Sequence, residues 1–242
     1  SDEQIHQARA LIEENVFPDF PFNDGPDRGG ISSKAHAWAL LLQPLMRSMI
    51  PGKTPIYLIS KPEAGTGASL LVQVIVRIAT GSDPETQTEK ASNEEQRKAI
   101  TAFLLTGAQH FFLDNINAFV AGSAYAGAVT SDIWSDRRLG VSETVTIPIR
   151  VTWIFAGNNV DMSGEMARRC LPIPLDAERN PKTREKFVHD NLPVWVDDNR
   201  PALVAACLTL IRAWVVRGRP EWQGQTLASF EGYCRTMGGV LE

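Results

Sequence analysis

The clearest chemical pattern in the sequence is a loop with two glycines that follows a short apolar run. The run covers residues 56–59, Gly65 and Gly67 come next, and a helical pattern begins near Leu70. A loop between a buried strand and a helix leaves backbone N–H groups facing a concavity, where they and the helix dipole can hold a phosphate. Glycine suits such a loop because the backbone has to turn with positive φ. Residues 60–69, called the glycine loop below, therefore predict a phosphate site.

The glycine loop carries only part of the full phosphate-loop pattern. In that pattern a Lys reaches the β and γ phosphates, and the next Ser or Thr coordinates Mg²⁺. Ser69 occupies the hydroxyl position, whereas Ala68 occupies the lysine position. Lys53 also follows a glycine and precedes a threonine, but Pro55 comes next and prevents a helix from starting there to receive a phosphate. By themselves, the two glycines could form no more than a tight turn.

Alternating helices and strands are predicted around this loop. The predicted helices cover residues 4–15, 33–49, 70–78, 92–105, 118–129 and most of the chain from 183 onward. The predicted strands cover residues 56–59, 110–115, 151–156 and 170–175, with an exposed edge strand or hairpin arm over 143–150. Two prolines place the 170–175 strand at a sheet edge. The strand over 110–115 delivers a carboxylate, Asp114, at its end, and residues 202–216 are apolar almost all round, as in a buried helix.

Four segments together resemble the AAA+ ATPases. Residues 62–69 are similar to the Walker A loop, residues 111–115 to the Walker B strand, and residues 151–159 to the sensor 1 strand. Residues 164–169 lie where such proteins carry an arginine finger. A finer similarity, over about residues 15–240, is to helicase-type ATPases of phages and integrated mobile elements, which are often linked to primases and include superfamily 3 and MCM-like forms.

The resemblance implies a fold and a division into domains. The implied fold is α/β, a P-loop NTPase (AAA+) parallel sheet flanked by helices, with a C-terminal helical lid. We expect an N-terminal helical and irregular segment over residues 1–29, the nucleotide-binding core over 30–176 and the helical lid over 177–242.

The resemblance also implies the functional residues, cofactors and partners. ATP would lie on the backbone amides of Ala64, Gly65, Thr66, Gly67, Ala68 and Ser69, with Mg²⁺ near Ser69 and Asp114. The implied catalytic positions are Asp114, Asn115, Asn158 (or Asn159 in its place), Arg168 and Arg169, of which the arginines would reach the nucleotide of a neighbouring subunit. The implied partners are further copies in a homo-oligomeric ring such as a hexamer, DNA along the hairpin over 141–150, and a primase or another replication protein.

Two departures from the family pattern leave hydrolysis open. Ala68 removes the main phosphate cation, and Asn115 stands where a water-orienting Glu is usual. Lys61 could supply the missing charge, and Glu89 or Glu94 the missing acid. The first function we predict is an ATP-binding helicase or translocase core for phage or mobile-element DNA replication. The alternative is a non-hydrolysing AAA+-like scaffold or DNA-loading module, and a third is an α/β enzyme that binds another phosphorylated ligand.

Composition limits the remaining possibilities. The 242 residues carry a net charge of −4, but residues 1–30 hold seven acids and two arginines, so the rest of the chain has a net charge of +1 and can contact DNA locally. The three cysteines are far apart and show no metal-ligand spacing. No stretch reaches the length of a membrane span, and residues 1–4 lack the features of a secretory signal. We therefore expect a cytoplasmic protein that does not contact membranes.

Overall fold

The structure is a computed structural model that describes residues 1–25, 30–62, 65–116, 123–137, 143–160, 162–177 and 186–242. Its helices are α1 (Asp2–Asn15), α2 (Ile31–Met46), the 3-10 turn η1 (Arg47–Met49), α3 (Ala68–Thr80), α4 (Asn93–Thr106), α5 (Ser123–Val129), α6 (Gly164–Ala167), α7 (Leu192–Val216) and α8 (Glu231–Leu241). Its strands are β1 (Ile56–Lys61), β2 (Thr86–Gln87), β3 (His110–Ile116), β4 (Ile133–Arg137), β5 (Thr144–Pro148), β6 (Thr152–Asn158) and β7 (Cys170–Pro174).

Five of the strands form a parallel sheet in the order β2-β3-β6-β1-β7. β7 lies at an edge, as predicted, because Pro172 and Pro174 have no N–H to donate to a further strand. The two-residue edge strand β2 was not predicted, since nothing in Thr86–Gln87 alternates or is apolar. The α/β class and the parallel sheet flanked by helices are confirmed.

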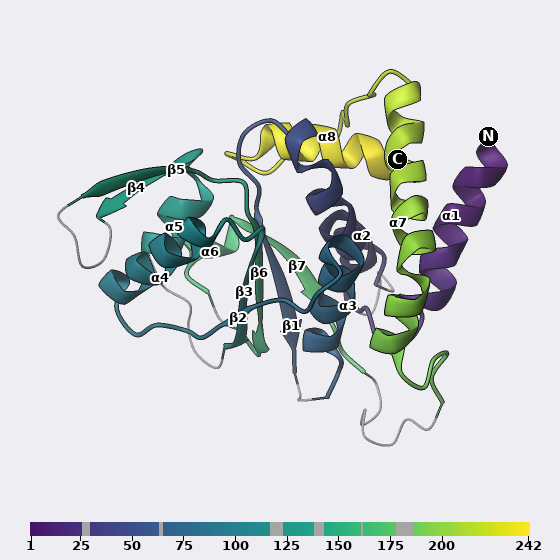
Figure 1. Ribbon diagram of the computed structural model, residues 1–242, viewed down its shortest axis with the longest axis horizontal. Coiled ribbons are helices and arrows are strands. Elements are labelled where there is room, and N and C mark those ends of the chain that lie inside the picture. Colours follow the sequence, from purple (N-terminus) through teal and green to yellow (C-terminus); the bar gives the residue numbers. More distant parts are fainter. Residues whose placement is uncertain (26–29, 63–64, 117–122, 138–142, 161, 178–185) are drawn as a thin grey trace.

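Helices cover both faces of the sheet (Figure 1). α2 and α3 lie on one face, and α4 and α5 lie on the other, while α7 and α1 form a further layer outside α2 and α3. Aromatic rings join the second face to the sheet: the ring centroid of Phe111 is 5.0 Å from that of Phe103 and 5.2 Å from that of Trp153. On the first face, the Tyr57 hydroxyl donates to Gln43 Oε1 at 2.9 Å, and Gln43 donates to Thr152 Oγ1 at 2.9 Å.

The helix boundaries follow local signals in the sequence. Ser92 caps α4 by accepting a hydrogen bond from the Glu95 N–H, and Gly107 ends the same helix with φ 75°. α3 begins at Ala68, earlier than predicted, directly after Gly67. Of the helix predicted over 118–129, residues 118–122 lie outside the described residues, and α5 begins at Ser123.

The strands β4 and β5 pair in an antiparallel two-stranded sheet beside α4. β5 is the predicted hairpin arm, but its partner β4 was missed because Ile133–Arg137 mixes charged and apolar residues without a clear period. Trp134 attaches β4 to α4 by donating from Nε1 to Thr101 Oγ1 at 2.8 Å. Thr101 in turn donates to Asp136, which pairs with Arg97 at 3.0 Å. The hairpin is therefore attached to α4 through side chains.

The prediction that residues 202–216 are buried all round is wrong. Leu203, Cys207 and Ile211 are buried, but Leu208 is 48% and Val216 is 75% exposed, because only one face of α7 meets α1 and α3. In the described part of the chain, α7 alone is long and apolar enough to pass for a membrane span, which is weak evidence because helices in the cores of soluble proteins pass the same test.

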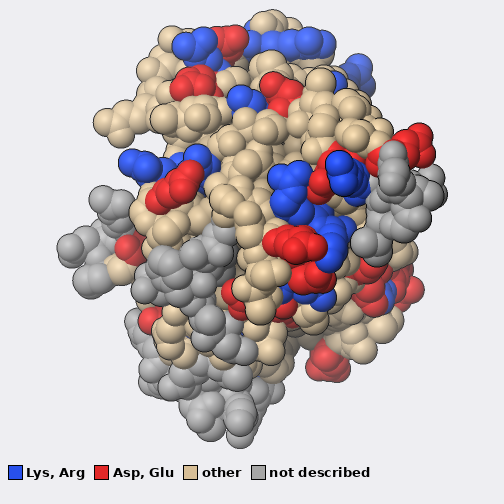
Figure 2. Space-filling view, turned by 90° about the vertical axis from the view of Figure 1, so that its left-hand side faces the viewer, with Lys and Arg blue, Asp and Glu red and all other residues tan. Residues whose placement is uncertain are grey.

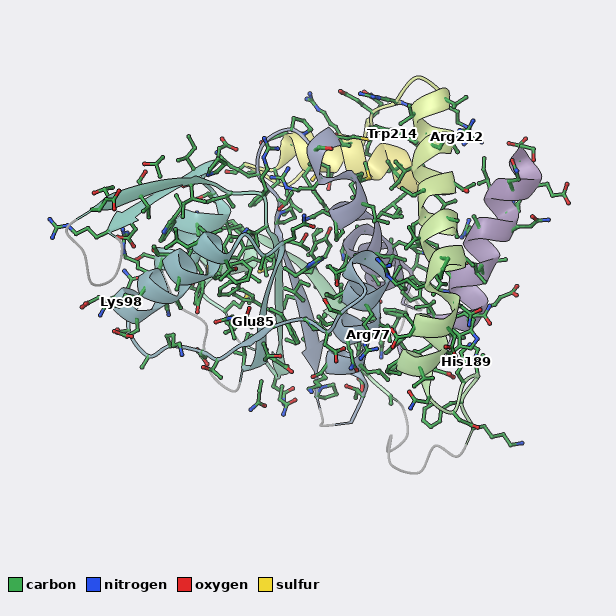
Figure 3. All side chains as sticks on the ribbon, in the orientation of Figure 1. Arg77, Glu85, Lys98, His189, Arg212 and Trp214 are labelled. Carbon is green, nitrogen blue, oxygen red and sulfur yellow. The ribbon has the colours of Figure 1, made fainter. Side chains whose placement is uncertain are left out.

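Polar side chains join α7 to α3. Arg77, on α3, pairs with Asp197 of α7 and with Asp83 at 2.6 Å, and it lies between the two helices (Figure 3). Arg200, on α7, donates to the carbonyl oxygens of Arg77, Ile78 and Ala79, which are the last carbonyls of α3. Since α3 starts at the glycine loop, these bonds connect α7 to the helix that follows that loop.

His110, at the start of β3, provides a test of this fold. Its side chain is buried, its Nε2 has no partner among the described residues, and burial lowers the pKa of its imidazole to about 4. The unfolded chain binds a proton near pH 6.5, where the folded chain does not, so stability falls as the pH drops below that value. We expect the free energy of unfolding to fall by about 2 kcal/mol between pH 7 and 5 through this group.

The measurement is urea unfolding at a series of pH values. His110→Phe should flatten the pH dependence between 7 and 5, whereas His6→Gln, which replaces an exposed imidazole, should leave it as in the wild type. An unchanged slope in His110→Phe would show that this imidazole is not held neutral.

Candidate functional site

The glycine loop has the backbone geometry that a phosphate site needs. Gly65 and Gly67 have φ values of 96° and 90°, in the left-handed region that favours glycine. Gly67 is the N-cap of α3, and no described side chain caps the first N–H groups of that helix. By contrast, Ser1, Ser92 and Asn191 cap α1, α4 and α7. The N-terminus of α3 is thus open to an anion. Ala64 lies outside the described residues.

The structure brings Ser69 and Asp114 together. Ser69 Oγ, on the first turn of α3, donates to Asp114 Oδ2 at 2.8 Å, and Asp114 Oδ1 accepts from the Asn115 N–H at 2.7 Å. The two oxygens that face each other come from the start of α3 and the end of β3. Hydroxyl and carboxylate oxygens are ligands that Mg²⁺ accepts in proteins, and the ion usually keeps several of its waters. The pair therefore fits one Mg²⁺, bound directly or through its water shell.

Asn115 departs from the regular strand. It has φ 57°, a left-handed value that Asn tolerates better than most residues, and its side chain is exposed. The pairing of β3 with β6 shifts register between Leu113 and Ile116, so Asp114 and Asn115 form an irregularity at the end of the strand. Position 115, directly after Asp114, therefore carries an amide and not a carboxylate.

Two buried polar atoms near the loop have no hydrogen-bond partner among the described residues. They are Thr66 Oγ1, in a residue that is 5% exposed, and Asn158 Oδ1, at the end of β6. Buried polar atoms are nearly always paired, so these two unpaired atoms, one in the glycine loop and one at the end of β6, are consistent with a polar ligand. Asn159 is different, because its side chain donates to the Pro62 carbonyl at 3.3 Å and its N–H donates to the Lys61 carbonyl at 2.9 Å. Asn159 thus fixes the loop, while Asn158 remains available.

The structure distinguishes the substitutes suggested for the missing charges. Lys61 pairs with Asn158 in the β1–β6 register and has no ion pair among the described residues. It lines a cavity of about 550 Å³ with Asp24 and Asp176, next to the glycine loop. Glu94 lies on the exposed face of α4 and forms an ion pair with Lys98 at 2.9 Å. Glu89 follows β2. Burial of Tyr125 is the main reason why the pKa of its hydroxyl is raised, and the negative charge of Glu89 raises it further. This hydroxyl has no hydrogen-bond partner in the described chain.

The two predicted finger arginines lie at the opposite end of the sheet. The Arg169 carbonyl accepts from the Ile56 N–H at 2.9 Å, at the start of β1, whereas Ser69 and Asp114 lie beyond the ends of β1 and β3. Neither arginine can therefore reach the glycine loop of its own chain. Arg169 pairs with Glu165 at 3.2 Å, whereas Arg168 is exposed and has no partner in the described chain. Of the two, Arg168 is the one available to another molecule.

Two residues that shape the site were not predicted. The Phe20 ring lies 3.3 Å from the position that a Cβ on Gly67 would occupy, so it packs against the backbone of Gly67. A Cβ on Gly157 would lie 2.2 Å from the Ile116 carbonyl oxygen, so β3 and β6 approach each other closely where their polar ends meet. Gly157 could have been noticed because it directly precedes the predicted site residue Asn158. Phe20 had no such signal, because it lies in the N-terminal segment that was predicted to be partly irregular.

Comparison with solved structures supports the fold. One similar structure is the A form apo structure of the C-terminal region of NrS-1, which is 15% identical, has a TM-score of 0.52, and matches 84% of this chain and 44% of its own. Another apo A form of that region, spanning residues 305–718, is 13% identical with a TM-score of 0.48, over 99% of this chain and 47% of its own. The chain thus spans less than half the length of the structures that it matches.

The first of these similarities shows a shared fold and, at this identity, nothing more. No family model matches the sequence, and a search of curated proteins finds no match. The assignment of the glycine loop to a P-loop family, the domain boundaries and the role of each site residue remain predictions.

Gly157 provides a test of how the site is positioned. We expect Gly157→Ala to lower the free energy of unfolding by about 2 to 3 kcal/mol, because the added methyl group would displace the Ile116 carbonyl and with it the end of β3. Gly127→Ala is the matched control: nothing lies within 4 Å of its added methyl group, which should stabilise α5 by about 0.5 kcal/mol. Urea unfolding measures both, and equal stabilities would contradict the close approach.

Proposed function

We propose that this chain is the ATP-binding core of an AAA+-type helicase or translocase for phage or mobile-element DNA replication, in which Ala68 and Asn115 keep hydrolysis at background. The hydrogen bond of 2.8 Å between Ser69 Oγ and Asp114 Oδ2 carries the proposal. It joins the hydroxyl after a glycine loop to the carboxylate at the end of a neighbouring strand, as the Walker A and Walker B resemblance implies. The uncapped N-terminus of α3 and the unpartnered Thr66 and Asn158 oxygens support the same site.

In this proposal the phosphates of ATP lie on the amides from Ala64 to Ser69, and Mg²⁺ is held near Ser69 and Asp114. Mg²⁺ would neutralise phosphate charge and fix the phosphate geometry. Asn158 contacts the terminal phosphate, and the cavity beside Lys61 is available to the remainder of the nucleotide. Arg168 reaches the nucleotide of a neighbouring copy in a ring, six copies in a hexamer, and DNA contacts the β4–β5 hairpin. Residues 141 and 142 of the predicted DNA-contacting segment lie outside the described residues.

Ala68 and Asn115 favour a second function, a non-hydrolysing AAA+-like scaffold or DNA-loading module. Ala68 has no ionisable group, so position 68 contributes no charge, and the exposed Asn115 carries an amide and no carboxylate. Phosphoryl transfer depends on a cation that stabilises phosphate charge and on an acid that orients the attacking water. Positions 68 and 115 supply neither the cation nor the acid. Lys61 and Glu89 are the candidates that would restore activity, and Glu94 is a weaker one because Lys98 holds it.

Nucleotide titration with and without Mg²⁺ tests the binding site. Because position 68 lacks a cation, Mg²⁺ should provide most of the charge that balances the phosphates. We expect Mg²⁺ to raise ATP affinity at least tenfold, about 1.4 kcal/mol, and Asp114→Asn to remove that gain while leaving the Mg²⁺-free affinity unchanged. Asp83→Asn is the matched control, since Asp83 pairs with Arg77 at the far end of α3. Absence of ATP binding to the wild type at millimolar nucleotide would overturn the proposal.

ATPase assays with single-stranded DNA separate the two functions. We expect phosphate release to stay at background in the wild type and to appear in Ala68→Lys, because lysine restores the phosphate cation. Ala68→Met, which adds a similar length without charge, should stay at background. Turnover by the wild type that Glu89→Gln abolishes would instead assign the missing acid to Glu89. Background rates in both the wild type and Ala68→Lys, with DNA assembly intact, would favour the scaffold.

A further inference from the structure

A cavity of about 620 Å³ lies at the amino-terminal end of the sheet, away from the glycine loop. The end of α2, the end of α4 and the base of the β4–β5 hairpin surround it. Its lining includes two arginines, Arg47 and Arg150, and the apolar side chains of Leu45, Leu104 and Pro148. β1 has six residues, so the cavity and the glycine loop are separated by about 20 Å.

Arg47 is buried yet incompletely hydrogen-bonded. Its residue is 9% exposed, and its guanidinium donates to the carbonyl oxygens of Ile50 at 3.0 Å, Gly52 at 2.8 Å and Ile149 at 3.5 Å. Its Nε has no partner in the described chain. Burial, and then the charge of Arg150, lower the pKa of the Arg47 guanidinium, which nevertheless stays charged in proteins. A buried, charged donor is therefore left unsatisfied at the edge of a cavity.

Arg150 adds a second positive charge to the same cavity. It lies two residues after the end of β5, is exposed, and has no ion pair among the described residues. The acid that acts on Arg47 is Asp132, so these three groups sum to one positive charge. The C-terminus of α4 also faces the cavity and contributes about half a negative charge. The Gly107 N–H already binds the Leu104 carbonyl there, and the positive charge still exceeds the negative.

We propose that this cavity binds one nucleotide unit of single-stranded DNA, with its phosphate between Arg47 and Arg150. A guanidinium pair matches the oxygens of a phosphate, and the apolar lining formed by Leu45, Leu104 and Pro148 suits a sugar or a base. Ile147 and Pro148 of β5 line the cavity, so single-stranded DNA that runs along the hairpin would reach the cavity. Figure 2, which faces the hairpin and α4, shows basic and acidic side chains interleaved, so DNA contact on this face depends on local sites.

This inference rests on the DNA-binding part of the proposed function, and it adds a contact made with η1, directly after α2, at the base of the hairpin. Arg47 is the buried donor, and its bonds to three backbone carbonyls fix the guanidinium before any DNA arrives. Arg150 is the exposed donor and can be replaced with little effect on the core. The two residues therefore have different uses in an experiment.

The test is fluorescence anisotropy of a labelled oligo-dT with the whole chain, at several salt concentrations. We expect Arg150→Gln to weaken binding five- to tenfold and to reduce the slope of log K against log salt by about 0.7, the loss of one phosphate contact with a single strand. Arg212→Gln removes the same charge from the outside of α7 (Figure 3) and should match the wild type. Arg47→Lys keeps the charge but loses the Nε–H and part of the guanidinium bonding to backbone carbonyls, and should weaken binding two- to fivefold with a lower Tm, so Arg150→Gln is the variant that decides the test.

Competition with unlabelled compounds distinguishes the sources of the phosphate. Oligo-dT should displace the probe at lower concentration than dTMP, and inorganic phosphate only at much higher concentration. The inference is overturned if Arg150→Gln matches the wild type in affinity and salt slope, if the wild type does not bind oligo-dT, or if inorganic phosphate competes as well as dTMP. Absence of ATP binding with Arg150-dependent DNA binding would overturn the nucleotide proposal alone.

Discussion

The parallel pairing of β1 with both β6 and β7 is the constraint on which the rest of this structure depends. Parallel strands all start on one side of a sheet and all end on the opposite side. Residues that follow the strands therefore lie together on the side where the strands end, which is called the carboxyl edge here. Lys61, Asn158 and Asp114 all lie at the ends of β1, β6 and β3, on the side where α3 begins. A single hydrogen bond from Ser69 to Asp114 then joins this edge to the helix.

The opposite edge of the sheet has a different character. There the chain turns from α2 into β1 and from the hairpin into β6, and Arg47 holds the carbonyls of those turns. Arg168 and Arg169 also lie at this edge, before β7. Four arginines thus lie where strands begin, whereas Asp114, Asn158 and Lys61 lie where strands end. Both edges connect to helices: α4 holds the hairpin through Thr101, and Arg200 holds α7 against α3.

Much of the sheet was predictable because its strands are apolar runs bounded by polar or glycine residues. The runs at 56–59, 110–115 and 151–156 need no partner to be recognised, since burial on both faces selects apolar residues throughout. β4 was missed because only one of its faces packs on α4, through Trp134, and its other residues meet water. For α7 the prediction of burial was too extensive, because an apolar composition does not show which face another helix will cover.

The sequence by itself determined the order of strand, glycine loop and helix, and the edge position of β7, because φ preferences and missing N–H groups are properties of single residues. It also placed Ala68 and Asn115 at positions where other residues would supply charge. Only the tertiary structure decided that Ser69 meets Asp114, that Asn159 is occupied while Asn158 is not, and that Arg47 and Arg150 share a cavity. These relations join residues far apart in the chain, and they exist only once the strands have taken their places in the sheet.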